Sequence, residues 1–215
     1  MSLITLTDPR SPVSEAYRAL RTNLSFYSLD DPIETLVVTS AEPDEGKSTT
    51  VANLAVTLAQ AGNRTILVDC DLRKPILHTL FGVENGKGFS EMVLSNGKEM
   101  PLVQTEVENL RLLTCGTKAP NPADLIGSRK CDDAIARLKS EADIVLFDAP
   151  PVIAVTDAVV LGAKVDGVLL VLQAGKSRRD RVERAKQLLE QAKARIVGAT
   201  LTNAPKDDSV GDYYG

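Results

Sequence analysis

The stretch that decides the fold is Thr39–Thr49, "TSAEPDEGKST". An apolar run, "ETLVVTS" (34–40), leads into it, and a helical pattern over 48–61 follows. A turn that joins an apolar strand to a helix and ends in Gly-Lys-Ser is the context of a phosphate-binding P-loop, although here Ala41 stands at the place of the first glycine. The stretch predicts a nucleotide-binding loop, and the alternative is an ordinary strand–turn–helix junction.

The residue types in this loop suit phosphate chemistry. Backbone N–H groups at a helix start bind phosphate oxygens. Lys47 is placed to neutralise the β- and γ-phosphates, and the Ser48 hydroxyl is placed to bind Mg²⁺. The three acidic residues of the loop, Glu42, Asp44 and Glu45, are expected to point to solvent while their amides point inward.

Apolar runs rich in β-branched residues recur along the chain after this loop. They span residues 64–69, 110–115, 143–148, 166–173 and 195–202. Strands of this kind, without alternation, are typical of a parallel sheet covered on both faces. Helical patterns such as 178–193 separate them. We therefore expect a P-loop NTPase-like α/β fold, with a doubly wound, mostly parallel sheet in a single domain.

The ends of the chain fall outside that repeating unit. A helix is expected over 12–28, with Ser11 as its N-cap and Pro12 at its first position. We divide the chain into an N-terminal segment (1–33), a core (34–204) and a flexible tail (205–215).

Length, composition and charge limit the number of domains, the possible partners and the cellular location. The 215 residues fit one domain, and the net charge of −4 gives no basic field for nucleic acid. Three cysteines form no CxxC pair, which suggests a reducing compartment. No apolar run approaches membrane-spanning length and the start lacks the apolar core of a signal peptide, so a cytoplasmic location is expected.

Carboxylates end two of the predicted strands. "ILVDCDLR" carries Asp69 and Asp71, and "IVLFDAPP" carries Asp148. Acids after apolar strands are costly unless something pairs with them, and Mg²⁺ is the natural partner beside a phosphate loop. A single acid of this kind is more often a helix cap than a metal ligand, whereas three on two strand ends indicate a nucleotide triphosphatase-type site.

These motifs together resemble one family. "TSAEPDEGKST", "ILVDCDLRKP" and "IVLFDAPP" resemble the Walker A, A′ and B motifs of bacterial tyrosine kinases (BY-kinases). "EAYRALRTN" (15–23) resembles that family's oligomerisation motif, and "CGTKAPNPADLI" (115–126) and "VTDAVVLG" (155–162) are also similar to family segments. The resemblance covers the chain from about residue 12 to its end.

The resemblance implies a function. It implies a Mg²⁺-ATP-dependent protein-tyrosine kinase of capsule and exopolysaccharide systems that phosphorylates other proteins and, in trans, its own C-terminal tyrosines. It also implies a ring-shaped homo-oligomer. A transmembrane activator of the polysaccharide co-polymerase type is expected to recruit the kinase to the inner face of the membrane.

Roles then follow residue by residue from the resemblance. Lys47, Asp69 and Asp71 are the catalytic candidates; a tyrosine hydroxyl, with a pKa near ~10, must lose its proton to one of the two acids. Asp69 is favoured as that base and Asp71 as a metal-shell residue, but the sequence does not order them. The nucleotide-binding candidates are Pro43, Asp44, Glu45, Gly46, Lys47, Ser48, Thr49 and Asn203, and the metal candidates are Ser48, Asp71 and Asp148. Asn203 resembles an adenine-contacting asparagine, or is a turn residue.

Two further groups of residues depend on the resemblance. Glu15, Arg18 and Arg21 share one face of the first helix; alone they would be a solvated charge set, and with the resemblance they are oligomer-interface candidates. Tyr213 and Tyr214 are the candidate phosphoacceptors, fewer than the tyrosine run at the end of many family members.

Two other functions remain as alternatives. A partition or division-site ATPase uses a similar sheet as a switch, but its P-loop carries a signature lysine where this chain has Glu42. A catalytically silent regulator of polysaccharide export is disfavoured by the intact set of Lys47, Ser48 and the three aspartates.

Overall fold

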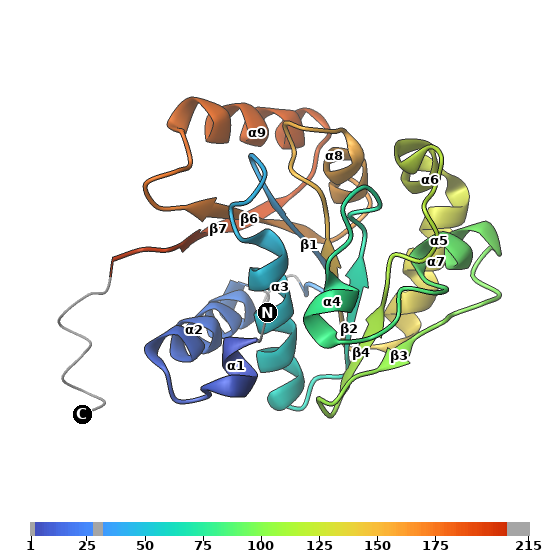
Figure 1. Ribbon diagram of the computed structural model, residues 1–215. Coiled ribbons are helices and arrows are strands. Elements are labelled where there is room, and N and C mark those ends of the chain that lie inside the picture. Colours follow the sequence, from blue (N-terminus) through green and yellow to red (C-terminus); the bar gives the residue numbers. More distant parts are fainter. Residues whose placement is uncertain (1–2, 28–31, 206–215) are drawn as a thin grey trace.

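Seven strands form one sheet in the computed structural model, which describes residues 3–27 and 32–205 (Figure 1). The strands are β1 Thr35–Ser40, β2 Thr65–Asp69, β3 Val103–Gln104, β4 Leu110–Leu113, β5 Ile144–Asp148, β6 Gly167–Gln173 and β7 Ile196–Thr202. Their order is β3-β4-β2-β5-β1-β6-β7, and every neighbouring pair is parallel except β3 with β4. The expected mostly parallel sheet is confirmed. Only the two-residue β3 was not predicted, because so short a strand leaves no periodic pattern.

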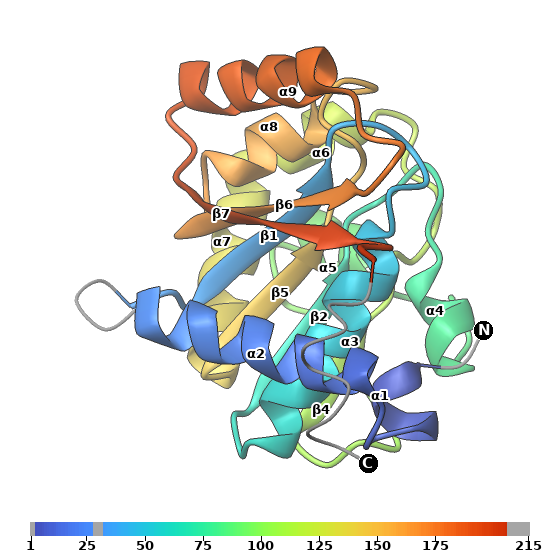
Figure 2. The same ribbon diagram turned by 90° about the vertical axis from the view of Figure 1, so that its left-hand side faces the viewer.

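Helices cover both faces of the sheet (Figure 2). They are α1 Ile4–Thr7, α2 Pro12–Tyr27, α3 Lys47–Gln60, α4 Leu77–Phe81, α5 Phe89–Leu94, α6 Pro122–Gly127, α7 Arg129–Glu141, α8 Asp157–Gly162 and α9 Arg179–Gln191. The helices α1 to α4 lie on one face, and α5 to α9 lie on the other. None of the described helices is both long and apolar enough to cross a bilayer.

The alternation of side chains along the strands separates two cores. On β1, Leu36 and Val38 pack on the α3 side, whereas Val37 packs on the side of α7 and α8. All three side chains are fully buried. Because both faces bury apolar side chains, the strand reads as a continuous apolar run, which is why the sequence revealed it.

The N-terminal segment packs on α3, the helix that follows the phosphate loop. Asn53 of α3 accepts hydrogen bonds from the backbone N of Thr5 at 3.1 Å and from its hydroxyl at 2.8 Å. Ser14 N donates to Ser11 Oγ at 3.2 Å, so the predicted N-cap of α2 is confirmed. The helix α1 was not predicted; four residues are too few for a helical period.

Asp166 ties the start of β1 to the turn before β6. Its Oδ2 accepts hydrogen bonds from the backbone N of Glu34 at 3.1 Å, from Thr35 N at 2.8 Å and from the Thr35 hydroxyl at 2.7 Å. Partial burial disfavours its charge, but the bonds from Thr35 outweigh that effect and lower the pKa of Asp166. The carboxylate therefore stabilises the fold in its charged form.

We predict that Asp166→Ala lowers the free energy of unfolding by about 1–3 kcal/mol at neutral pH, because three donors lose their acceptor. A carboxyl group whose pKa is lowered by folding stabilises the protein above its unfolded pKa, and that contribution is lost as pH falls through the folded pKa. In urea titrations the difference from wild type should be largest at neutral pH and shrink below about pH 4. Glu108→Ala, at an exposed carboxylate, is the control. A pH-independent difference would contradict this account of Asp166.

Candidate active site

The phosphate loop runs from the end of β1 to the first residue of α3. Gly46 has a φ of 89°, in the left-handed region, and a Cβ there would lie 3.3 Å from Thr202 Cγ2. Glycine is the residue that tolerates this conformation. Because it has no side chain to cap α3, the amides of the first turn stay open for an anion. The predicted P-loop context, strand then turn then helix, is present.

One expectation about the loop was wrong. Asp44 is exposed, as predicted, but Glu45 is only 1% exposed and does not point to solvent. Its Oε2 accepts a hydrogen bond from Glu42 N at 2.8 Å, and its Oε1 accepts one from the Ser177 hydroxyl. Glu45 therefore holds the loop closed on itself, a role that spacing along the sequence could not reveal because Ser177 is 132 residues away.

Two residues from the β6 and β7 ends also hold the loop, and sequence reasoning missed both. Lys176 Nζ donates to the carbonyl oxygens of Pro43 at 3.1 Å and Asp44 at 2.8 Å. The Thr202 hydroxyl donates to the carbonyl oxygen of Glu45 at 3.0 Å. These contacts fix the loop backbone from outside, and fixed backbone amides are what phosphate binding requires.

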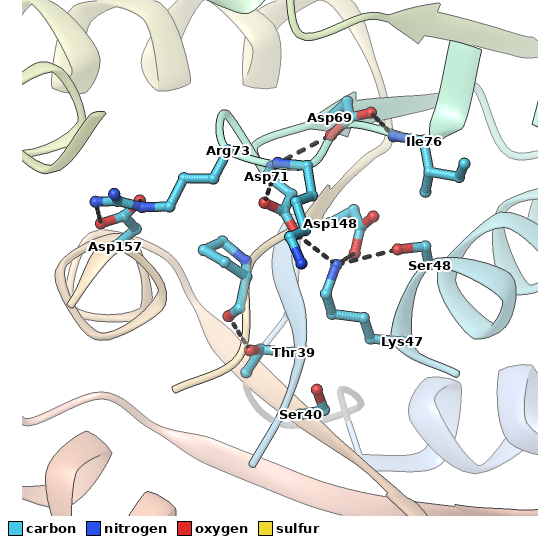
Figure 3. Close-up of polar contacts among 12 residues, drawn as sticks. Thr39, Ser40, Lys47, Ser48, Asp69, Asp71, Arg73, Ile76, Asp148 and Asp157 are labelled. Carbon is cyan, nitrogen blue, oxygen red and sulfur yellow. Dashed lines mark hydrogen bonds and ion pairs between the residues drawn. The ribbon is translucent and has the colours of Figure 1, made fainter. Parts of the chain in front are cut away.

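The predicted acids meet at the carboxyl edge of the sheet (Figure 3). Asp69 and Asp148 are the last residues of β2 and β5, and they are register partners on these neighbouring strands. Lys47 Nζ lies 2.9 Å from Asp71 Oδ2 and 3.2 Å from Asp148 Oδ1, and it donates to the Ser48 hydroxyl at 3.1 Å. The fold thus brings the loop lysine and the strand-end carboxylates together.

The pKa values of these groups are perturbed by burial and by each other. Burial disfavours charge on Lys47, but Asp148 and Asp71 outweigh it and raise its pKa. Burial raises the pKa of Asp148, and Lys47 offsets this only in part. Burial, with Asp148 next to it, raises the pKa of Asp69 to about 8. The single positive charge of Lys47 cannot balance the three carboxylates of the site.

The two candidate bases are held differently. Asp69 is fully buried; its Oδ2 accepts from the backbone N of Ile76 at 3.1 Å and of Leu77 at 3.0 Å, at the start of α4. Its Oδ1 accepts from Asp71 N at 3.2 Å. Asp71 turns instead toward Lys47 (Figure 3). The pair therefore divides into one carboxylate that organises the segment after β2 and one that faces the lysine.

The donor set fits a magnesium ion held with a nucleotide. Asp148 Oδ2 is buried and has no hydrogen-bond partner among the described residues, which a cation would remedy. Within the described part of the chain, no three His, Cys, Asp or Glu side chains are arranged to hold a metal by themselves. Mg²⁺ commonly takes only one or two protein ligands and completes its shell with phosphate oxygens and water. Ser48, Asp71 and Asp148 are the predicted ligands, and one or two of them together with phosphate oxygens would meet that pattern.

Asn203 directly follows β7, next to the loop contact made by Thr202. It is exposed and has a φ of 53°, a left-handed conformation that asparagine adopts more readily than most residues. This conformation fits the turn role, and both that role and the adenine contact stay predictions.

The segment "CGTKAPNPADLI" is shaped by Glu91, which was not predicted. Glu91 Oε2 accepts from Gly88 N at 2.7 Å, and Oε1 accepts from Thr117 N at 3.1 Å. Gly116 has a φ of 80°, and a Cβ there would lie 2.0 Å from Glu91 Oε2. This glycine and this glutamate together set the path of the loop that leaves β4.

The other predicted groups lie away from this cluster. Arg18 Nη1 forms an ion pair with Glu15 at 2.5 Å, and Arg21 Nη1 donates to the carbonyl oxygen of Thr57 at 2.9 Å. These contacts are within one chain, so the interface role of the three residues stays a prediction. Tyr213 and Tyr214 lie outside the described residues.

Comparisons with known proteins identify the family of the chain. Residues 33–203 match the ParA family model, described as "NUBPL iron-transfer P-loop NTPase". The chain is 41% identical to tyrosine-protein kinase YwqD of Bacillus subtilis, over 100% of this chain and 91% of that protein. It is 33% identical to tyrosine-protein kinase etk of Escherichia coli, covering 98% of this chain but only 29% of that longer protein.

Solved structures place the chain in the same group. The chimerical protein CapA2B2 matches with a TM-score of 0.89 and 38% identity, over 95% of this chain and 90% of that one. The kinase domain of E. coli tyrosine kinase ETK matches with a TM-score of 0.87 and 31% identity, over 95% and 82% of the two chains. A septum site-determining MinD from Pyrococcus horikoshii, at 23% identity and a TM-score of 0.66 over 83% and 76% of the two chains, shares the fold alone. The chain therefore belongs to the P-loop NTPases of the ParA model and, with full-length relatives above 30% identity, to the bacterial tyrosine-protein kinases.

Proposed function

We propose that this protein is an ATP-dependent protein-tyrosine autokinase that phosphorylates Tyr213 and Tyr214, and other proteins, in the control of capsule or exopolysaccharide synthesis. The observation that carries the proposal is the position of Lys47, between Asp71 and Asp148, at the start of a glycine-led helix. The relatives named as tyrosine kinases cover the whole chain, which supports the same reading.

Bound Mg²⁺-ATP supplies the transferable phosphoryl group and a divalent cation that offsets phosphate charge. The backbone N–H groups of residues 44–49 would bind phosphate oxygens, and their fixed backbone means that little reorganisation is needed. Lys47 would bind the β- and γ-phosphate oxygens from its place beside Asp71 and Asp148. Ser48, Asp71 and Asp148, which all contact Lys47, are the residues that would hold the cation. Asn203, which directly follows β7, is the candidate for contact with the adenine base.

The acceptor tyrosine needs a base, and the two carboxylates after β2 are the candidates. We favour Asp69: burial raises its pKa, so its carboxylate, once a bound cation favours the charged form, is a stronger proton acceptor than an ordinary aspartate. Asp71 faces Lys47 and is assigned to the cation. Asp69 is fully buried, so variants must test whether a tyrosine hydroxyl can reach it.

We predict different losses for Asp69→Asn and Asp71→Asn. The first should lower the rate of tyrosine phosphorylation by about 10²–10⁴-fold while nucleotide affinity stays near wild type, because Asp69 is assigned to proton transfer and not to the nucleotide. The second should raise the Mg²⁺ concentration needed for nucleotide binding. Quench-flow kinetics and titration with a fluorescent ADP analogue measure the two effects. The reverse pattern would assign the base to Asp71.

We further propose that the kinase assembles into a ring and works with a membrane-bound activator. In etk the matched part is only 29% of the protein, so that relative joins a segment of this kind to a much longer sequence. The chimeric construction named CapA2B2 is in keeping with two cooperating components. In the ring, Glu15, Arg18 and Arg21 of α2 contact the neighbour, and one chain's tail enters the next chain's site. The activator brings the ring to the inner face of the membrane.

A mixing experiment tests kinase activity and transfer between chains together. Chains with Lys47→Met keep their tyrosines but lose the phosphate contact, and chains with Tyr213→Phe and Tyr214→Phe keep the site but lose the acceptors. After incubation with Mg²⁺-ATP and the cytoplasmic segment of a candidate activator, mass spectrometry should find phosphate on Tyr213 or Tyr214 of the Lys47→Met chains only in the mixture.

Adding Glu15→Ala and Arg18→Ala to both chains should reduce this transfer, and light scattering should show smaller particles. ATP hydrolysis without any phosphotyrosine, in the mixture and in wild type alike, would favour the switch-ATPase function instead. That alternative rests on the ParA model match.

A further inference from the structure

The segment that carries Asp71 is anchored from outside by Arg73. Arg73 Nε donates to Asp157 Oδ2 at 3.0 Å, and Nη2 donates to Asp157 Oδ1 at 3.1 Å (Figure 3). Two parallel bonds from one guanidinium to both oxygens of a carboxylate fix distance and orientation together. A lysine, as a point charge, cannot reproduce that geometry.

Asp157 lies in the segment that follows β5, so the Arg73–Asp157 contact, called the clamp below, reaches from the β2 side of the site to the β5 side. It is the first residue of α8, which follows the loop leaving β5 after Asp148. Arg73 lies in the segment leaving β2 after Asp69, and Asp69 and Asp148 are register partners. The Arg73–Asp157 pair thus connects the two loops that leave adjacent strands and carry the acids of the site.

The pair is unequal in burial. The Asp157 side chain is fully buried, whereas that of Arg73 is 42% exposed. A buried carboxylate that loses its partner is left uncompensated, which is far more costly than breaking an exposed ion pair. The start of α8 favours a negative charge at Asp157 as well. Asp157 is therefore the fixed partner of the pair, and Arg73, which is partly exposed, is the partner that can move away from it.

Inside the segment, Asp71 is held by short-range contacts. Its Oδ1 accepts from Lys74 N at 3.0 Å, and its own N donates to Asp69 Oδ1 at 3.2 Å. These two contacts stay within the turn, whereas Cys70 N donates to the carbonyl oxygen of Asp148 at 2.9 Å and Asp71 pairs with Lys47. Among the described residues, Arg73 makes the side-chain contact that spans from this turn to the β5 side of the site.

We propose that Arg73 is a positioning residue, which by its clamp on Asp157 holds the turn after β2 so that Asp71 stays beside Lys47 at the cation position. The proposal rests on the proposed function. Displacement of a reacting or binding group by about 1 Å can cost on the order of 10²-fold in rate. The clamp thus acts on cation binding and turnover through Asp71, without touching nucleotide or substrate itself.

The chain contains a matched control on the same two strands. Arg64 precedes β2 and Asp143 precedes β5, and Arg64 Nη2 lies 2.6 Å from Asp143 Oδ1, with Nε at 3.0 Å. This pair joins β2 to β5 at the opposite edge of the sheet, far from the acids. Both side chains of this pair are exposed, so Arg64→Ala shows what the loss of an arginine–aspartate contact between these strands does away from the acids.

The test compares wild type with Arg73→Ala, Arg73→Lys, Asp157→Asn and Arg64→Ala. Binding of a fluorescent ADP analogue is titrated with Mg²⁺ and repeated in EDTA, and kcat and KM for tyrosine phosphorylation are measured with activator present. For Arg73→Ala we expect the half-saturating Mg²⁺ concentration to rise about tenfold and kcat to fall about 10–100-fold, with KM and metal-free nucleotide affinity nearly unchanged. Arg73→Lys should be intermediate, and Arg64→Ala should match wild type.

Wild-type Mg²⁺ dependence and kcat in folded Arg73→Ala would overturn the proposal, and so would equal losses in Arg73→Ala and Arg64→Ala. If Arg73→Ala does not fold, Arg73→Lys and Asp157→Asn decide: a normal Mg²⁺ titration in both overturns it. The Mg²⁺ titration needs no phosphotransfer. Failure of the kinase function itself would instead appear as wild type that binds Mg²⁺-nucleotide and forms no phosphotyrosine.

Discussion

The structure depends on one electrostatic constraint: a single lysine, Lys47, must balance the negative charge of the carboxylates at the ends of two buried strands. Lys47 contacts Asp71 and Asp148, and Asp69 lies next to Asp148 on the neighbouring strand. Burial raises the pKa values of Asp69 and Asp148, since water cannot solvate their charges. The charged form of these carboxylates is favoured when a divalent cation binds beside them. The phosphate groups of a nucleotide then balance the positive charge of the cation and of Lys47.

The surrounding fold serves to keep this cluster in place. The parallel sheet brings the carboxyl ends of β1, β2 and β5 to one edge, where ligands of open α/β sheets bind. Glu45, Lys176 and Thr202 fix the phosphate loop from the β6 and β7 side. On the other side, Arg73 and Asp157 join the loops that leave β2 and β5. The site is thus held at both flanks by contacts between segments distant in sequence.

This arrangement explains which features could be predicted from sequence. Strands buried on both faces are continuous apolar runs, and acids that follow them are conspicuous, so the sheet and Asp69, Asp71 and Asp148 were foreseeable. Glu45 was expected in solvent, because a charged residue in a loop is usually exposed and its partner Ser177 is distant in sequence. The Arg73–Asp157 pair spans 84 residues, and no local pattern announces it. Local periodicity in the sequence predicts helices and strands and where they end. Contacts between loops can be seen only in the folded structure.

The most direct test of the central claim is the melting temperature of the protein with ATP in excess Mg²⁺ and with ATP in EDTA. At a hundredfold excess over Kd, a ligand that binds only the folded state stabilises it by about 2.7 kcal/mol. For a chain of this size that corresponds to a rise of roughly 5–10 °C. The account predicts this rise with Mg²⁺ and a much smaller one in EDTA, with Asp148→Asn losing the Mg²⁺-dependent part. Equal shifts with and without Mg²⁺ would contradict it, because the buried carboxylates would then have no part in binding the nucleotide.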